Sequence, residues 1–306
     1  MKCRFCAMPL HDVLLDLGSA PPSNAFLTAD ALNAPETWFP LKLFTCSNCH
    51  LVQIDEVQSH AALFAPDYAY YSSFSRSWLA HAERYVEQAV AKLALDQRSL
   101  AMEIASNDGY LLQYVKARGI PCIGIEPTTG TAKAAQEKGI ETLTRFFGRE
   151  FAGEFVRTRR RADLIVANNV LAHVPDLNDF VAGIVVALAE GGTVTVEFPH
   201  LMELIAHKQF DTVYHEHFSY FSLHTVRSIF AAHGLRVWDV EQLPTHGCSL
   251  RIWAAHEHSN HVETPAVAAL LSLEARAGMQ DAAYYQGFQA QADAVKNDCL
   301  TFLLEQ

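Results

Sequence analysis

The chain alternates short apolar runs with stretches of helical periodicity between residues 99 and 198. Alternation of this kind predicts a parallel sheet that is covered by helices on both faces. A further helix is expected before this region, because Trp78, Tyr85 and Val86 belong to an apolar stripe with helical spacing. Strands are expected at 99–105, 122–126, 162–167 and 193–198, and helices at 129–138 and 178–188.

The order of elements changes after residue 222. A helix is expected at 223–233, and a short turn then joins two strands at 235–243 and 249–255. A late hairpin of this kind suits the antiparallel edge of a class I methyltransferase sheet, whereas a plain dinucleotide-binding sheet would more often continue with parallel units. Residues 264–306 have a helical pattern. One apolar face of this stretch needs a partner in the core domain or in a second subunit. The residues of that face are Ala266, Val267, Leu270 and Leu271.

The first 65 residues have a different character, with many prolines and little long periodicity. Such a segment cannot bury a large core and needs a staple. Two pairs, Cys3-x2-Cys6 and Cys46-x2-Cys49, have the spacing that lets one turn place two thiolates on the same ion. The predicted site is a closed, structural four-sulfur zinc site, with a redox pair or chance spacing as alternatives. His50 is an additional possible ligand, although four thiolates already saturate the ion.

Composition and charge limit the classes of binding partner that we expect. The chain has 306 residues and a formal net charge of −11, so an acidic surface should repel phosphate backbones and nucleic-acid binding is not expected. No run reaches the roughly 18 apolar residues of a membrane helix, and the N-terminus lacks the apolar core of a signal peptide. We therefore expect a cytoplasmic protein with no membrane partner.

A cofactor cleft is expected where the first strand of the core ends and a helix opens. Ligands of open α/β sheets bind at the carboxyl ends of such strands, and small residues there allow a tight turn. A carboxylate at the end of the second strand can bind both ribose hydroxyls, which fits a nicotinamide dinucleotide or S-adenosylmethionine. The G-x-G-x-x-G pattern is absent, and polar residues end the strand at 162–167, which favours S-adenosylmethionine. The predicted cofactor-binding residues are Glu103, Ser106, Asn107, Asp108, Gly109, Glu126, Pro127, Asn168, Asn169 and His173.

Two of these assignments keep plain alternatives. The alternative for Asn168 and Asn169 is capping of the turn after the strand, and His173 alone is equally compatible with a packed histidine.

Residues 210–222 form the densest chemical stretch of the chain. Methylation of a carbon needs a base for a C–H proton and a donor for the enolate oxygen, and an imidazole beside a carboxylate can be that base. The alternatives are an aromatic core turn, or a metal site formed by His215, Glu216 and His217. A second aromatic cluster, residues 68–75, is expected to line a polar pocket or to form an interdomain packing turn.

Together the motifs resemble the sugar C-methyltransferases that act on nucleotide-linked deoxysugars. The resemblance covers nearly the whole chain. It rests on the four cysteines, on a Y-x-Y-x-S-S turn at 68–73, and on an E-I-G-S-N-D-G turn at 103–109 in which Ala105 replaces a glycine. It also rests on a Y-x-E-H-x-S-Y stretch at 214–220 and on an H-G-x-S-x-R element at 246–251. The resemblance implies His217 as the base, with Tyr214, Glu216 and Tyr70 supporting a keto sugar.

The expected protein is thus an α/β S-adenosylmethionine-dependent methyltransferase with a Rossmann-like class I sheet. Its expected parts are a zinc lobe at 1–65, the methyltransferase domain at 66–258 and a helical extension at 259–306. Family members usually carry a further C-terminal domain, which we expect to be missing here. The expected activity is methylation of a carbon in a nucleotide-linked 4-keto deoxysugar by a monomer or homodimer. An O- or N-methyltransferase and a non-catalytic remnant are the alternatives.

Overall fold

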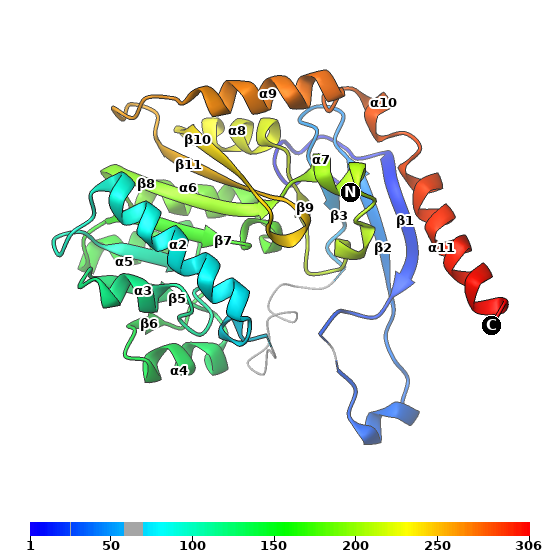
Figure 1. Ribbon diagram of the computed structural model, residues 1–306, viewed down its shortest axis with the longest axis horizontal. Coiled ribbons are helices and arrows are strands. Elements are labelled where there is room, and N and C mark those ends of the chain that lie inside the picture. The colour runs from blue at the N-terminus through cyan, green and yellow to red at the C-terminus, as the bar shows by residue number, and fades with distance from the viewer. Residues whose placement is uncertain (25, 58–69) are drawn as a thin grey trace.

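The computed structural model describes residues 1–24, 26–57 and 70–306. Its centre is a seven-stranded sheet with the order β10-β11-β8-β7-β4-β5-β6 (Figure 1). The strands are β4 (Ala101–Ile104), β5 (Cys122–Ile125), β6 (Thr142–Leu143), β7 (Ala162–Asn168), β8 (Leu188–Pro199), β10 (Leu235–Leu243) and β11 (Ser249–His256). Strand β11 lies antiparallel between β8 and β10, and β4 to β8 pair in parallel. The expected α/β core and its late antiparallel strand are confirmed.

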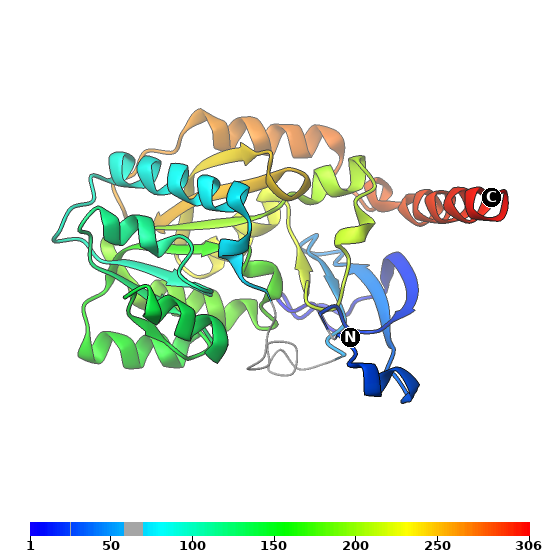
Figure 2. The ribbon, with the colours of Figure 1, turned by 60° about the horizontal axis from the view of Figure 1, so that its bottom comes forward.

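Helices cover both faces of this sheet because the inner strands are apolar on both sides. Along β7, Leu164 and Val166 face one core, while Ile165 and Ala167 face the other. The first core is covered by α2 (Arg76–Leu93), α3 (Leu112–Ala117) and α4 (Thr129–Glu137), and the second by α5 (Arg149–Thr158), α6 (Leu177–Ala187) and α8 (Leu223–Ala232). Figures 1 and 2 show the two layers.

A second sheet of four antiparallel strands, β1-β2-β3-β9, forms the N-terminal lobe. Three strands come from the start of the chain: β1 (Asp12–Ala20), β2 (Phe39–Thr45) and β3 (Val52–Ile54). The fourth, β9 (Ser219–Tyr220), comes from the stretch that carries the predicted catalytic residues. A short helix, α7 (Leu201–Ala206), packs into the same core, and η1 (Ala29–Asn33) lies at the tip of the β1–β2 arm.

The C-terminal residues form α9 (Pro265–Ala277), α10 (Ala282–Tyr285) and α11 (Phe288–Leu304). Val267 and Leu270 on α9 are buried in the core beside α8 and β10, so the apolar face predicted there has its partner within this chain. Ala266 from the same predicted face is exposed. Helix α11 packs its first turns on β1 and then projects from the molecule (Figure 2).

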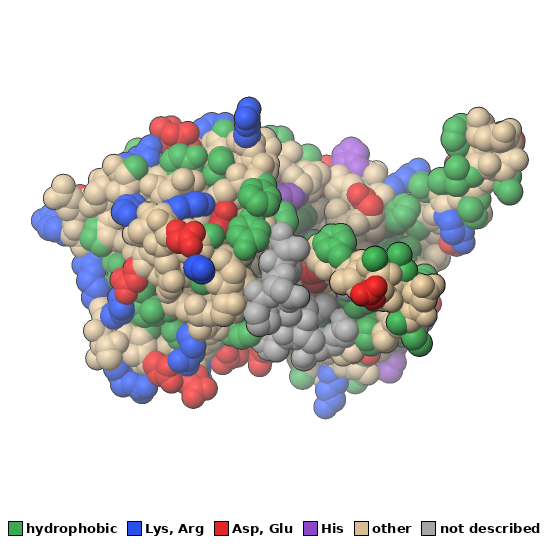
Figure 3. Space-filling model, turned by 90° about the horizontal axis from the view of Figure 1, so that it is seen from below, with side chains coloured by type: hydrophobic (Ala, Val, Ile, Leu, Met, Phe, Trp, Pro, Cys, Tyr) green, Lys and Arg blue, Asp and Glu red, His purple; other side chains and the backbone are tan. Residues whose placement is uncertain are grey.

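The face of the molecule in Figure 3 carries charges of both signs. On the face in Figure 3, Lys and Arg side chains are interspersed with Asp and Glu, without a continuous basic surface. No helix in the described part of the chain is long and apolar enough to cross a membrane.

Candidate functional site

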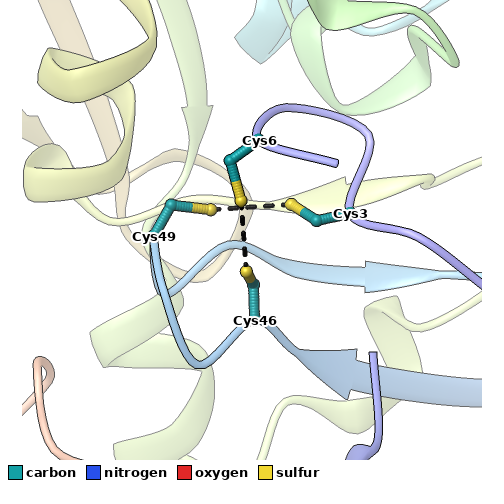
Figure 4. Close-up of side chains that lie close together, drawn as sticks. All are labelled: Cys3, Cys6, Cys46 and Cys49. Atoms are coloured by element: carbon teal, nitrogen blue, oxygen red, sulfur yellow. Dashed lines mark hydrogen bonds between the residues drawn. The ribbon is translucent and has the colours of Figure 1, made fainter. Parts of the chain in front are cut away.

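The four paired cysteines converge as the spacing predicts (Figure 4). Their sulfur atoms all lie within 4.8 Å of one another, and the Cys3–Cys49 and Cys6–Cys46 sulfur pairs are each 3.5 Å apart. A tetrahedral ion with Zn–S bonds of about 2.3 Å requires sulfurs roughly 3.8 Å apart, whereas a disulfide requires about 2.05 Å. The cluster therefore fits a closed zinc site.

Backbone turns shape this cluster. The N–H of Ala7 donates to the Cys3 carbonyl and that of His50 to the Cys46 carbonyl, each over 2.9 Å. Ala7 and His50 are both left-handed, so the two knuckles repeat one geometry. His50, the additional possible ligand, lies beside His224 instead and is outside the cluster.

A buried amide supports the sulfurs. The Gln53 Nε2 group donates to Cys3 Sγ over 3.3 Å, and its Oε1 accepts from the Arg4 N–H over 2.9 Å. The pKa of the Cys3 thiol lies below its ordinary value, because its sulfur accepts from the Cys49 thiol, from the backbone N–H groups of Cys6 and Phe5, and from the Gln53 amide. A stabilised thiolate is the form that binds zinc.

A cavity of about 1020 Å³ opens at the carboxyl edge of the parallel strands. It brings together the catalytic candidates Tyr70, Tyr214, Glu216 and His217 with six cofactor candidates, namely Asn107, Glu126, Pro127, Asn168, Asn169 and His173. Four predicted cofactor residues do not line it: Glu103, Ser106, Asp108 and Gly109. The sequence pattern therefore identified the edge of the sheet, while only part of the turn faces the cavity.

The turn after β4 is held by Glu126 at the end of β5. The Glu126 Oε2 atom accepts from the Asn107 N–H over 2.8 Å, and Oε1 accepts from the Thr128 N–H over 2.9 Å. The Asn107 side chain in turn accepts from the Ser72 N–H over 2.9 Å and donates to the Tyr70 carbonyl over 3.0 Å. The cofactor turn and the aromatic segment at Tyr70 thus form one connected wall. Tyr68, from the same motif, lies outside the described residues.

Three residues at this edge have a left-handed backbone. Ala105, Asn107 and Asn169 have φ values of 53°, 48° and 53°, in the left-handed region that non-glycine residues rarely occupy. Ala105 is the position where the resembled motif has glycine, and the left-handed backbone gives the physical reason for a glycine there. At Gly109, φ is 75° and an added Cβ would lie 2.5 Å from the Ile140 side chain, so the turn also needs its glycine.

The remaining turn residues lie beneath the cavity. Glu103 on β4 is 1% exposed, and burial raises the pKa of its carboxyl well above the usual range. The Asp108 Oδ2 atom accepts from the Ser73 N–H over 3.3 Å and lies 3.4 Å from the Lys138 ammonium. Ser106 is fully buried under the turn. These side chains shape the turn from below.

Tyr214 and His217 form a hydrogen-bonded pair in the cavity. The His217 Nδ1 group must donate to the Thr212 carbonyl, 3.0 Å away, because a carbonyl oxygen only accepts. Its Nε2 therefore carries the lone pair and accepts from the Tyr214 hydroxyl over 2.8 Å. Burial, with His173 nearby, lowers the pKa of His217 well below its usual value, so the ring is neutral at neutral pH. Burial beside Glu216 raises the pKa of Tyr214.

The neighbouring side chains diverge. Glu216 lines the cavity, whereas His215 is buried and donates from Nε2 to the Pro40 carbonyl in the lobe, 3.2 Å away. Tyr70 also lines the cavity and is 49% exposed to solvent. The four cysteines are the metal-suited cluster among the described residues, and His215, Glu216 and His217 do not form one.

Several cavity residues had no assignment from the sequence. Ser23 and Asn24 reach the cavity from the lobe, and Trp78 and His246 form another part of its wall. Trp78 belonged to a predicted helix and His246 to the resembled H-G-x-S-x-R element. Nothing in the sequence pattern placed Ser23 or Asn24 beside residues almost two hundred positions later.

Comparison with known proteins places this geometry in a family. Family models match a zinc binding domain at residues 3–64, a methyltransferase domain at 78–240 and a C-methyltransferase C-terminal domain at 244–306. The last match corrects the expectation that the C-terminal domain is missing. It was missed because a helical, alanine-rich stretch carries no motif, and because this domain begins within the β10–β11 hairpin that we assigned to the core.

Individual proteins agree with these models. The C-methyltransferase NovU of Streptomyces niveus is 34% identical over 298 residues, covering 96% of this chain and 70% of NovU. The PH0226 protein of Pyrococcus horikoshii shares the fold at a TM-score of 0.50 and 12% identity, over 61% of this chain and 94% of that one. With its zinc-binding lobe and its class I methyltransferase sheet, the chain belongs to the C-methyltransferase family and is an S-adenosylmethionine-dependent methyltransferase.

Proposed function

We propose that this enzyme methylates a carbon next to the ketone of a nucleotide-linked 4-keto deoxysugar. The observation that carries the proposal is the Tyr214–His217 pair, which shares one cavity with the strand-end turn at Asn107. A carbon acceptor needs a proton acceptor within reach of the methyl donor. Family membership supplies the C-methyltransferase class, and the sugar substrate comes from the resembled motifs.

The residues around the turn suit S-adenosylmethionine. Glu126 lines the cavity, and two backbone N–H groups fix its carboxylate there, so that its remaining lone pairs would bind the ribose hydroxyls. The Asn169 Oδ1 atom is buried without a hydrogen-bond partner among the described residues, which suits a donor such as the ammonium of the cofactor. When bound, this cofactor supplies an electrophilic methyl group. Asn168, Pro127 and His173 complete the proposed lining of its site.

In this proposal, Tyr214 and His217 together remove the proton from the carbon next to the ketone. As the C–H bond breaks, its proton passes to the Tyr214 oxygen while the Tyr214 proton moves to His217 Nε2. The fixed tautomer of His217 leaves Nε2 ready to receive it. The electron pair would move onto the ketone oxygen. The enolate carbon would then take the methyl group that the bound cofactor supplies, with the sulfur–methyl bond breaking and S-adenosylhomocysteine leaving. Tyr70 and Glu216 would hold the sugar hydroxyls and the ketone in place.

The test separates proton removal from methyl transfer. Candidate 4-keto sugar nucleotides are incubated in D₂O with enzyme, with and without S-adenosylmethionine, and their mass is followed. We expect deuterium exchange at one carbon and a gain of one methyl group, both lost in His217→Asn. The exposed His207 gives the matched control, because His207→Asn leaves the cavity intact. Exchange at the wild-type rate in His217→Asn would place the base elsewhere.

A further inference from the structure

The N-terminal lobe reaches into the catalytic cavity through two side chains. Ser23 Oγ and Asn24 Nδ2 each donate to Glu216 Oε1 over 2.8 Å, and both residues line the cavity. Glu216 is 1% exposed, so its carboxylate depends on protein donors instead of water. Two donors on one carboxylate oxygen fix the direction of the other oxygen.

The backbone that leads to these donors is restricted by two prolines. It leaves β1 at Ala20 and continues with Pro21 and Pro22, whose rings fix the backbone φ angle. Asn24 has φ of 58°, a left-handed conformation that asparagine tolerates better than most residues. Residues 21 to 24 thus have a restricted backbone in the conformation that places both donors on Glu216.

The base of the same hairpin is held by the cysteine cluster. Strand β2 ends at Thr45, and Cys46 follows directly. Arg4, beside Cys3, donates from Nη1 to the Pro175 carbonyl over 2.9 Å, next to the cavity-lining Val174. Arg4, beside the cysteine cluster, and the Ser23–Asn24 segment thus both attach the lobe to residues that line the cavity.

Glu216 is connected to the catalytic pair. Its backbone carbonyl accepts from His173 Nδ1 over 2.8 Å, and its charge adds to the effect of burial in raising the pKa of Tyr214. A change in the charge or position of the Glu216 carboxylate would therefore affect Tyr214 and His173. It would also affect His217, which is hydrogen-bonded to Tyr214.

We propose that Ser23 and Asn24 are positioning residues that hold the Glu216 carboxylate toward the sugar, so that the lobe completes the catalytic cavity. This role rests on the proposed function. It gives the lobe a part in catalysis beyond the folding role that a closed zinc site implies.

The kinetic test uses Ser23→Ala, Asn24→Ala and the double variant. Loss of both charge-assisted hydrogen bonds should lower the exchange rate roughly a hundredfold at saturating substrate. Affinity for S-adenosylmethionine and zinc content should stay at the wild-type level, and Ser23→Thr should keep most of the rate. Thr28→Ala and Asn33→Ala are matched controls, since both side chains are exposed on the same arm. An unchanged rate in the double variant, or loss of zinc and cofactor together, overturns the proposal.

A second variant reports on Glu216 itself. Asn24→Asp places a carboxylate against Glu216 Oε1, and two such groups share a proton at low pH. The acid limb of the exchange rate should therefore move to higher pH, because the nearby His173, His217 and Tyr214 are the same in both proteins and the added carboxylate is the only difference. Asn33→Asp should leave the profile unchanged. A uniform decrease in Asn24→Asp without a change of profile would contradict the positioning role.

A third measurement needs no substrate. In a double-mutant cycle between the Ser23→Ala/Asn24→Ala pair and Glu216→Ala, the unfolding equilibrium constants should show about tenfold coupling. Glu216→Gln replaces Glu216→Ala if the latter does not fold. Absence of coupling refutes the contact. If wild-type enzyme exchanges no 4-keto sugar nucleotide, the proposed substrate fails, and the coupling alone then decides whether the lobe holds Glu216.

Discussion

Affinity for S-adenosylmethionine should depend strongly on Glu126. In Glu126→Ala, two hydrogen bonds from ribose hydroxyls to a charged carboxylate would be lost. Each such bond contributes about 1.5–3 kcal/mol, so the loss is at least ~3 kcal/mol, or roughly a hundredfold in Kd. The buried N–H groups of Asn107 and Thr128 also lose their acceptor, which loosens the turn that faces the cofactor.

Glu126→Gln tests the charge at constant shape. One carboxylate oxygen accepts from the Asn107 N–H and the other from the Thr128 N–H, so an amide NH₂ must oppose one of these donors. We therefore expect Glu126→Gln to bind the cofactor weakly as well. Glu137→Ala on α4 is the control, because its side chain is 69% exposed.

The assay is isothermal titration with S-adenosylhomocysteine and its 2′-deoxy form. Wild-type enzyme should lose affinity when the 2′-hydroxyl is removed, whereas Glu126→Ala should bind the two ligands alike. If Glu126→Ala binds S-adenosylhomocysteine as tightly as wild type, the ribose is held elsewhere. A deoxy penalty that persists in the variant would lead to the same conclusion.

Further predictions follow from single contacts. Glu274 is fully buried, accepts from the Leu223 N–H over 2.6 Å and pairs with His200, so Glu274→Ala should lower the urea-unfolding free energy by about 3 kcal/mol. Metal analysis should find about one zinc per chain, lost in Cys46→Ser together with protease resistance of the lobe. The pKa of His217 is lower in the folded protein than in the unfolded chain, so its contribution to stability is present above pH ~6.5 and decreases as the pH falls. The loss is up to about 1.4 kcal/mol at pH 5.5. The urea midpoint should therefore fall less steeply with acid in His217→Asn than in the wild type.

The main sheet could be predicted because its strands are buried and continuous. β4, β5 and β7 are apolar runs, and each ends in polar residues at the cavity. Periodicity and strand-end chemistry are local signals, and both survive in the fold. β6 was not predicted because two residues carry no period.

Contacts between distant segments could not be predicted in this way. β9 has only two residues, and its pairing with Val52 and Gln53 depends on tertiary packing. The contact of Ser23 with Glu216 joins segments 193 positions apart and involves a serine in a proline-rich loop. Glu103 shows the opposite case. Its motif was recognised in the sequence, but the side chain is buried beneath the cavity and does not line it, which the sequence alone does not reveal.

The stretch at 210–222 shows why the three parts of the chain act together. Its middle is tied to the core, since the Phe218 N–H donates to the Ala172 carbonyl over 2.7 Å, one residue before His173. Its last strand, β9, pairs with β3 of the lobe. Directly after residue 222, the Leu223 N–H donates to Glu274 of the C-terminal extension. The segment that presents Tyr214 and His217 is thus fixed by contacts from all three parts. A base and a methyl donor must be held within a fraction of an ångström of their working positions, and a loop fixed by one part alone would leave that distance to local fluctuation. If Tyr214 and His217 act as proposed, the lobe and the extension would supply rigidity to this segment, which lies in the chain between β8 and β10 of the main sheet.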